Sequence, residues 1–332
     1  GTYPSTVIPA NDFKIKATVN QTVAPLVLPI TSGNQYSSLT YINGLWNVNT
    51  PAPSYDARPI ANRTLPHVGN VNYPFLTVSD FLEDTLIEMP YALNDSKFFS
   101  AGYQSINNQA VSYLLPIKPT FFDYFTSDDL TGKVAGKPMI EMGYIATGVS
   151  VILRIPIVGS GSVNHIEYKR LYFKGNAVNL NRNEGAIKEA KFGLGMLPVI
   201  KQSAQSRVAL YDKDQANISL EFLCGSTSIS AAKSVRRVKN NVACSIETYV
   251  LNDPFDVIVL KSANIRGLIV PNYQKYSGNS VFTFAVDFGT SNTHIEYCID
   301  GNPAKAFDIQ MTARGVVDAQ AANYKPREEQ VS

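Results

Sequence analysis

Short, mostly apolar segments separated by polar turn residues dominate the chain from about residue 138 onward. Short segments of this kind, bounded by turn residues, are typical of β-strands. The segments are rich in β-branched and aromatic residues, are separated by Gly, Asn, Asp or Ser, and cover residues 148–158, 163–174, 207–212, 217–224, 243–251, 255–260 and 266–273. Strands at this spacing predict an antiparallel, sandwich-like β-rich module over residues 138–280.

The region before residue 138 has a different pattern. Thirteen of the nineteen prolines fall within residues 1–139, and proline ends or kinks helices. We therefore expect an irregular, proline-rich α+β region over residues 1–137. Together with the module that follows, this predicts a chain that is mainly β with some α.

Four segments fit helices better than strands. The strongest spans residues 77–89, where Thr77 or Ser79 can cap the first turn, acidic residues follow, and Pro90 stops the helix. A shorter helix is expected within residues 119–130, with its aromatic side chains packed in the core. Residues 183–196 and 228–241 are two further candidates.

Composition narrows the class of protein. The chain has 332 residues, 45% of them hydrophobic and 17% charged, which is typical of a folded chain with about two domains. The formal net charge of +2 gives no general attraction to nucleic acid or to an anionic membrane, so we expect neither as a partner. No apolar run reaches the ~18 residues of a membrane-spanning helix, and no secretory signal is visible, so we expect a cytoplasmic location. Cys224, Cys244 and Cys298 lack CxxC spacing, and we expect buried free thiols rather than a disulfide or zinc site.

One stretch near the end of the chain carries candidate chemistry. Val281–Val286 is a mostly apolar run that fits a strand buried on both faces, and His294–Ile299 returns as a second strand. Asp287 stands at the end of the first strand, where a carboxylate can face a hydrated divalent cation. The polar turn offers hydroxyls, an amide and backbone N–H groups to phosphate oxygens, from Gly289, Thr290, Ser291, Asn292 and Thr293.

The segment Asp287–Thr293 resembles the first phosphate-binding motif of the actin-like ATPase superfamily, which joins actins, sugar kinases and the seventy-kilodalton heat-shock chaperones. The family pattern is an apolar strand followed by D-x-G-T-[ST]-N-[ST], and DFGTSNT fits each constrained position. The resemblance implies that Asp287 organises Mg²⁺ through water and that Gly289–Thr293 contacts the β- and γ-phosphates of ATP. It also implies that residues 281–311 form the opening β-meander of the family, with residues 304–311 as its third strand.

The family's second phosphate motif and its adenosine-binding Gly-Gly motif have only poor counterparts. The segment at Glu141 has Glu where the family has Asp, and the segment at Phe222 has one Gly where two are expected. We therefore expect residues 281–332 to be the truncated start of an actin-like ATPase domain. The chain would then be an N-terminal fragment that binds protein partners through its β-rich module and has no ATPase turnover of its own.

A second hypothesis is left open by the sequence. The chain can instead be a non-catalytic β-sandwich protein, structural or partner-binding, in which Phe282–Asp300 is only a hairpin without a nucleotide role.

Overall fold

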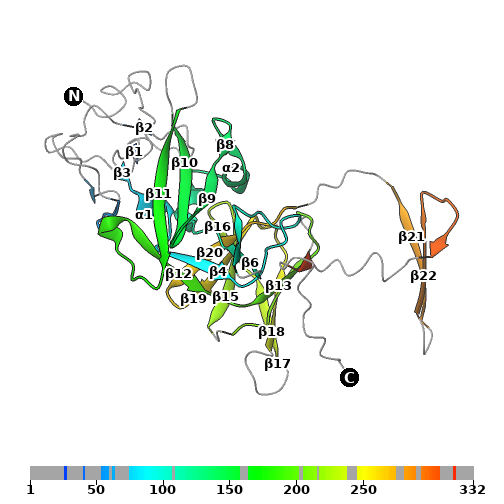
Figure 1. Ribbon diagram of the computed structural model, residues 1–332. Coiled ribbons are helices and arrows are strands. Elements are labelled where there is room, and N and C mark those ends of the chain that lie inside the picture. Colours follow the sequence, from blue (N-terminus) through cyan, green and yellow to red (C-terminus); the bar gives the residue numbers. More distant parts are fainter. Residues whose placement is uncertain are drawn as a thin grey trace.

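All seven strands expected from the sequence are present in the computed structural model. They are β10 (Gly148–Ile157), β11 (Asn164–Lys174), β14 (Ser206–Tyr211), β15 (Ile218–Cys224), β18 (Ser245–Leu251), β19 (Val257–Ser262) and β20 (Ile265–Ile269). In β15 the apolar side chains of Ile218, Leu220 and Phe222 are buried, while Ser219 and Glu221 between them are more exposed. The prediction of a mainly β chain with some α is confirmed (Figure 1).

The structure describes residues 26–27, 40–41, 54–59, 62–63, 75–106, 109–157, 164–201, 205–214, 217–237, 245–273, 280–288, 293–306 and 317–318. None of the helices in these ranges has the length and apolar character that crossing a bilayer requires. Cys224 and Cys298 are free, as expected, but both are partly exposed rather than buried. Cys244 lies outside the described residues.

The largest sheet has seven strands in the order β5-β6-β4-β12-β11-β10-β9. Besides β10 and β11, its strands are β4 (Thr85–Met89), β5 (Tyr103–Ile106), β6 (Gln109–Tyr113), β9 (Ile140–Ile145) and β12 (Glu184–Glu189). The two pairings that β12 makes, with β4 and β11, are parallel, and the other pairings are antiparallel. Strands from both sides of residue 137 therefore share one sheet.

This sheet curves until its two edges approach each other. A Cβ built on Gly102, just before β5, would lie 3.5 Å from Cβ of Met142 on β9, at the opposite edge. The rings of Tyr113 and Tyr144, on β6 and β9, have centroids 6.2 Å apart. The concave side of the sheet therefore resembles the interior of a small barrel. Tyr113 and Tyr144 lie together at one end of this interior.

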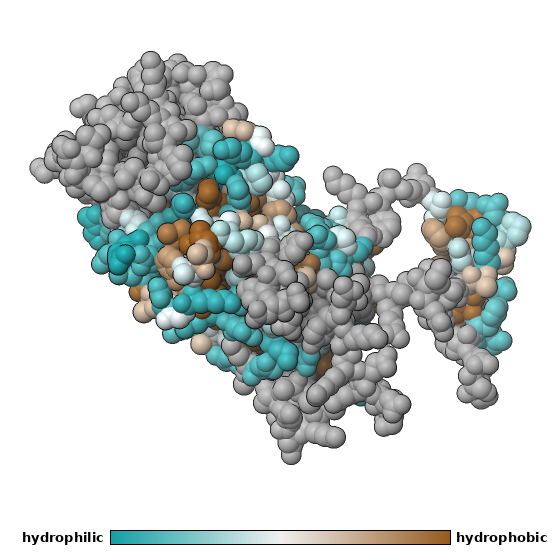
Figure 2. All heavy atoms as spheres, viewed as in Figure 1, coloured by the Kyte–Doolittle hydropathy of each residue, from teal (hydrophilic) through white to brown (hydrophobic). Residues whose placement is uncertain are grey.

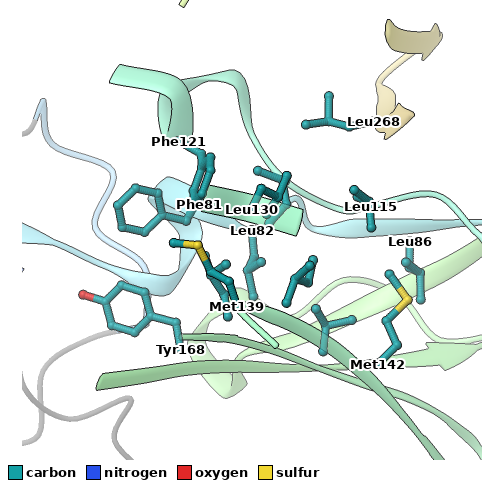
Figure 3. Close-up of a cluster of buried hydrophobic side chains, with 14 of the residues drawn as sticks. Phe81, Leu82, Leu86, Leu115, Phe121, Leu130, Met139, Met142, Tyr168 and Leu268 are labelled. Atoms are coloured by element: carbon teal, nitrogen blue, oxygen red, sulfur yellow. The ribbon is translucent and has the colours of Figure 1, made fainter. Parts of the chain in front are cut away.

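The first core fills the concave side of this sheet (Figure 3). It includes Phe81, Leu86, Phe121, Val151 and Tyr168. Three short helical segments contribute to it: α1 (Val78–Phe81), η4 (Pro119–Asp123) and α2 (Ser127–Thr131). A two-stranded ribbon of β7 (Lys133–Val134) and β8 (Lys137–Pro138) follows α2.

The second core lies between two further sheets, as in a sandwich. The four-stranded sheet β16-β15-β19-β20 contributes Phe222 and Leu260, and the five-stranded sheet β17-β18-β14-β13-β24 contributes Leu194 and Leu210. The strands not yet placed are β13 (Gly193–Leu197), β16 (Thr227–Ile229), β17 (Ala232–Arg237) and β24 (Val317–Asp318). A small sheet, in the order β2-β1-β3, joins Leu26–Val27 (β1), Thr40–Tyr41 (β2) and Phe75–Leu76 (β3).

The helix expected over residues 77–89 is largely wrong. Thr77 does occupy the N-cap position of a helix, where its backbone N–H and hydroxyl donate to Asp80 Oδ2 at 2.5 and 2.9 Å, but α1 ends at Phe81. The rest of the segment forms β4, whose five residues are all buried. Leu86 packs in the first core and Ile87 in the second, so both faces of β4 are buried. A strand can be buried in this way because its neighbours on both edges pair with its backbone N–H and C=O groups.

The two later helix candidates are also wrong, whereas the one at residues 119–130 is confirmed as η4 and α2. Residues 183–196 form β12 and most of β13, and residues 228–241 include β17. Hydrogen bonds from β4 and β11 to β12, and from β18 to β17, outweigh the small helix preference of Ala, Lys and Arg. The aromatic side chains of residues 119–130 do pack in the first core.

A network of buried charged side chains connects the five-stranded sheet to the turn before β15, in which Lys213 lies. Lys213, 2% exposed, donates to Glu247 Oε1 at 2.6 Å and to the carbonyl of Ile218 at 3.3 Å. Glu247 Oε2 accepts from Tyr249 at 2.8 Å and lies 2.9 Å from Lys233 Nζ. Burial alone would raise the pKa of Glu247, but the hydrogen bonds from the two lysines and Tyr249 outweigh it and lower the pKa.

This network predicts acid sensitivity. A carboxyl whose pKa is lower in the folded state adds stability above its unfolded pKa, and this contribution disappears as the pH falls through the folded value. Glu247→Gln should cost about 1–3 kcal/mol of unfolding free energy at pH 7, because the charged hydrogen bonds weaken, and the cost should shrink below about pH 4. Urea unfolding across this pH range measures both effects. Glu221→Gln is the control, since that carboxylate pairs with Lys261 on the surface and should matter little at any pH.

Candidate functional site

The candidate phosphate-binding residues lie on a hairpin of two regular strands, β21 (Phe282–Phe288) and β22 (Thr293–Ile299). The register runs from Phe282 opposite Ile299 to Phe288 opposite Thr293, so residues 289–292 connect the strands. A third strand, β23 (Lys305–Ala306), pairs with β22. The predicted strand–turn–strand arrangement and a third strand within residues 304–311 are thus present as a three-stranded meander.

The two faces of this meander differ in chemistry. On one face, Phe282, Phe284 and Val286 stand opposite Ile299, Tyr297 and Ile295. The ring of Phe284 stacks between its neighbours, with centroids 6.3 Å from Phe282 and 6.1 Å from Tyr297. On the other face, Thr283, Ala285 and Asp287 stand opposite Cys298, Glu296 and His294. Cross-strand aromatic and β-branched pairs of this kind hold a hairpin together.

The expectation that Val281–Val286 is buried on both faces is wrong for this structure. Val281, Phe282, Phe284 and Val286 are 67%, 53%, 52% and 45% exposed. Figure 2 shows hydrophobic atoms on the surface of this meander, which stands apart from the other described strands in Figure 1. The strand is amphipathic, since Thr283 within the run and Asp287 directly after it lie on the same face.

Asp287 is the residue proposed to bind the cation, and the structure describes its side chain. It is exposed and lies one residue before the end of β21, on the polar face. His294, its cross-strand neighbour, contacts Glu296, with 3.1 Å between His294 Nε2 and Glu296 Oε1. An exposed carboxylate beside a turn fits outer-sphere contact to Mg²⁺, which keeps most of its water and needs few protein ligands. No group of three or more His, Cys, Asp or Glu that could hold a metal ion occurs among the described residues.

The remaining predicted site residues are only partly described. Gly289, Thr290, Ser291 and Asn292 lie outside the described residues. Thr293 pairs through its backbone with Phe288 and begins β22. The structure therefore places the two ends of the predicted phosphate-binding turn next to each other.

The meander is connected to the sandwich at both ends. The chain leaves the sandwich after β20, forms β21, β22 and β23, and then adds β24 to the edge of the five-stranded sheet. In that pairing Asp318 stands opposite Gly195 and Val317 opposite Met196 of β13.

A second polar cluster could not be found from the sequence. Tyr113 and Lys174 both contact Glu88, although they are 25 and 86 residues away from it along the chain. Their strands meet only because the seven-stranded sheet brings them together, so no local motif marks them.

Comparisons with protein-family models, with curated proteins and with solved structures find no match for this chain.

Proposed function

We propose that this chain carries the first phosphate-binding hairpin of an actin-like or chaperone-like ATP-binding protein, with ATP and Mg²⁺ as ligands. The observation that carries the proposal is the register of the hairpin. Because Phe288 pairs with Thr293, the motif residues Gly289–Asn292 form the whole connection, and Asp287 lies directly beside it. A short polar turn between two paired strands concentrates backbone N–H groups and hydroxyls in a small volume, as phosphate binding requires.

Each residue has a distinct role in this proposal. Asp287 holds the hydrated cation, and Gly289 lets the backbone come close to the phosphates. Thr290, Ser291, Asn292 and Thr293 supply hydrogen-bond donors to the β- and γ-phosphate oxygens. When bound, Mg²⁺ neutralises the phosphate charge and orients the nucleotide.

The exposed apolar face of the meander supports its place in a larger ATPase sheet. Phe282, Phe284 and Tyr297 expose aromatic surface that water solvates poorly, and burying such surface is worth roughly 25 cal/mol per Å². We propose that other parts of an ATPase domain cover this face. On this proposal the sandwich and curved sheet form an interaction module for protein partners, in a cytoplasmic protein.

The nucleotide proposal predicts the effect of Asp287→Ala. In the product of the whole reading frame that contains this chain, the variant should bind a non-hydrolysable ATP analogue about 10–100-fold more weakly when Mg²⁺ is present, because one charge-assisted contact is lost. Without Mg²⁺ the difference should be small. Isothermal titration calorimetry measures both affinities.

Glu296→Ala is the matched control. It removes a carboxylate from the same face of the hairpin, but Glu296 pairs with Ala285, farther from the turn. Equal affinities for wild type and a stably folded Asp287→Ala variant would reject the nucleotide role. The hairpin would then be an architectural element of a non-catalytic β protein.

A further inference from the structure

A charged group is buried at the end of the curved sheet where β6 and β9 meet. Glu88, on β4, is 5% exposed. Its Oε1 accepts from Lys174 Nζ at 2.7 Å, and its Oε2 accepts from the Tyr113 hydroxyl at 2.9 Å. Burial, together with the hydrogen bond to Glu88, raises the pKa of Tyr113, so the phenol stays neutral and continues to donate.

A cavity of about 500 Å³ opens beside this group. Apolar side chains line one part of it, from Ile145, Ala146 and Ile187. Tyr113, Thr147 and Lys174 supply the polar part. The volume lies within the range of roughly 300–1,000 Å³ that small-molecule sites occupy, and the mouth of a barrel is a common place for such sites.

The backbone keeps the β9–β10 turn close to β11 on one side of the cavity. A Cβ on Gly148 would lie 1.9 Å from the carbonyl oxygen of Tyr172, so this close approach requires glycine. The turn residues Ala146 and Thr147 are exposed at the cavity. They can therefore be replaced without disturbing the core.

The charges favour an anionic ligand over a cation. Both oxygens of Glu88 already accept a hydrogen bond, and its side chain is only 6% exposed, so an incoming cation has little access to it. The side chain of Lys174 is 52% exposed, and Glu88 uses one of its three N–H donors. Glu88 thus orients an ammonium group that can still donate to a ligand.

We propose that this cavity binds a small carboxylate with an apolar body, such as an aryl- or alkyl-substituted short-chain acid. The ligand carboxylate accepts from Lys174, and Thr147 offers a hydroxyl beside it. The apolar body of the ligand packs against Ile145, Ile187 and the ring of Tyr113. A single ammonium group suits a singly charged carboxylate better than a phosphate, which needs more donors.

Calorimetry on the full chain tests the proposal with three probes of one shape: 3-phenylpropionate, its neutral amide and the corresponding amine. The acid should bind, and the amide and the amine should each bind at least about tenfold more weakly, since they lose the charge-assisted hydrogen bond. Lys174→Met should weaken binding of the acid by about tenfold or more, and Lys174→Arg should retain most of it.

Two further variants separate binding from folding. Lys188→Met removes an exposed lysine from the neighbouring strand β12 and should leave binding unchanged. Ala146→Trp fills the cavity from the exposed turn and should abolish binding without lowering stability, even if Lys174→Met unfolds. The proposal is overturned if the acid does not bind wild type, if the amine binds as well as the acid, or if Ala146→Trp binds normally.

Discussion

Arg170→Met should destabilise the protein by about 3–5 kcal/mol, because it leaves several buried hydrogen-bond acceptors without their donor. Arg170 is 0% exposed. Its guanidinium donates to the carbonyls of Leu82 and Glu83 at 2.9 and 3.0 Å, to Asn183 Oδ1 at 3.0 Å, and to the hydroxyl of Ser79. Methionine fills part of the volume but leaves these acceptors without a donor.

Guanidinium chloride unfolding, followed by fluorescence and circular dichroism, measures the loss. Arg182→Met is the control, since the side chain of Arg182 is 72% exposed and forms an ion pair with Glu184 at 3.1 Å. The control should change the unfolding free energy by less than about 1 kcal/mol. A loss below about 1 kcal/mol for Arg170→Met would mean that Arg170 contributes only as a surface charge does, and the structural assignment would be wrong.

Phe81→Ala should cost about 3–5 kcal/mol for a different reason, the loss of packing in the first core. Phe81 is 0% exposed, and its ring centroid lies 6.1 Å from that of Phe121, 6.0 Å from Tyr124 and 5.9 Å from Tyr168. Figure 3 shows Phe81 beside Phe121, with Tyr168 on the strand below. Alanine leaves a cavity that the surrounding sheet and helices cannot close.

The same substitution at an exposed ring provides the comparison. Phe284→Ala, on the meander, should shift the unfolding free energy of the sandwich and curved sheet by no more than about 0.5 kcal/mol, because Phe284 is 52% exposed. Denaturation of both variants in parallel distinguishes the sites. A large loss from Phe284→Ala would show that the meander is packed against the rest of the chain.

The candidate nucleotide site was visible in the sequence because it is local. The residues from Asp287 to Thr293 are consecutive, and a strand pattern stands on either side of them. The fold needs only one antiparallel pairing to bring the two ends of the turn together. The cavity beside Glu88 has the opposite character, since its lining residues come from β6, β9, β10, β11, β12 and the β9–β10 turn.

The strands between residues 138 and 280 can be predicted from the residue order alone, because β-branched and aromatic segments there are bounded by turn residues. In β15 the apolar residues Ile218, Leu220 and Phe222 are buried and the polar residues between them are more exposed, and this contrast is present in the residue order itself. The capping of α1 by Thr77 and Asp80 is equally local, because the partners are three residues apart.

The strand conformation of residues 85–89 and 184–189 depends on partners that are distant in the sequence. In β4 both faces are buried, by two different cores, so its residues carry no alternation and fit a helix equally well. In β12 the backbone partners are β4 and β11, of which β4 lies about a hundred residues earlier in the chain. Local propensity favours a helix by only a few tenths of a kcal/mol per residue, and by roughly 0.7 kcal/mol at most for ordinary residues. The hydrogen bonds and burial that such distant partners supply exceed this preference.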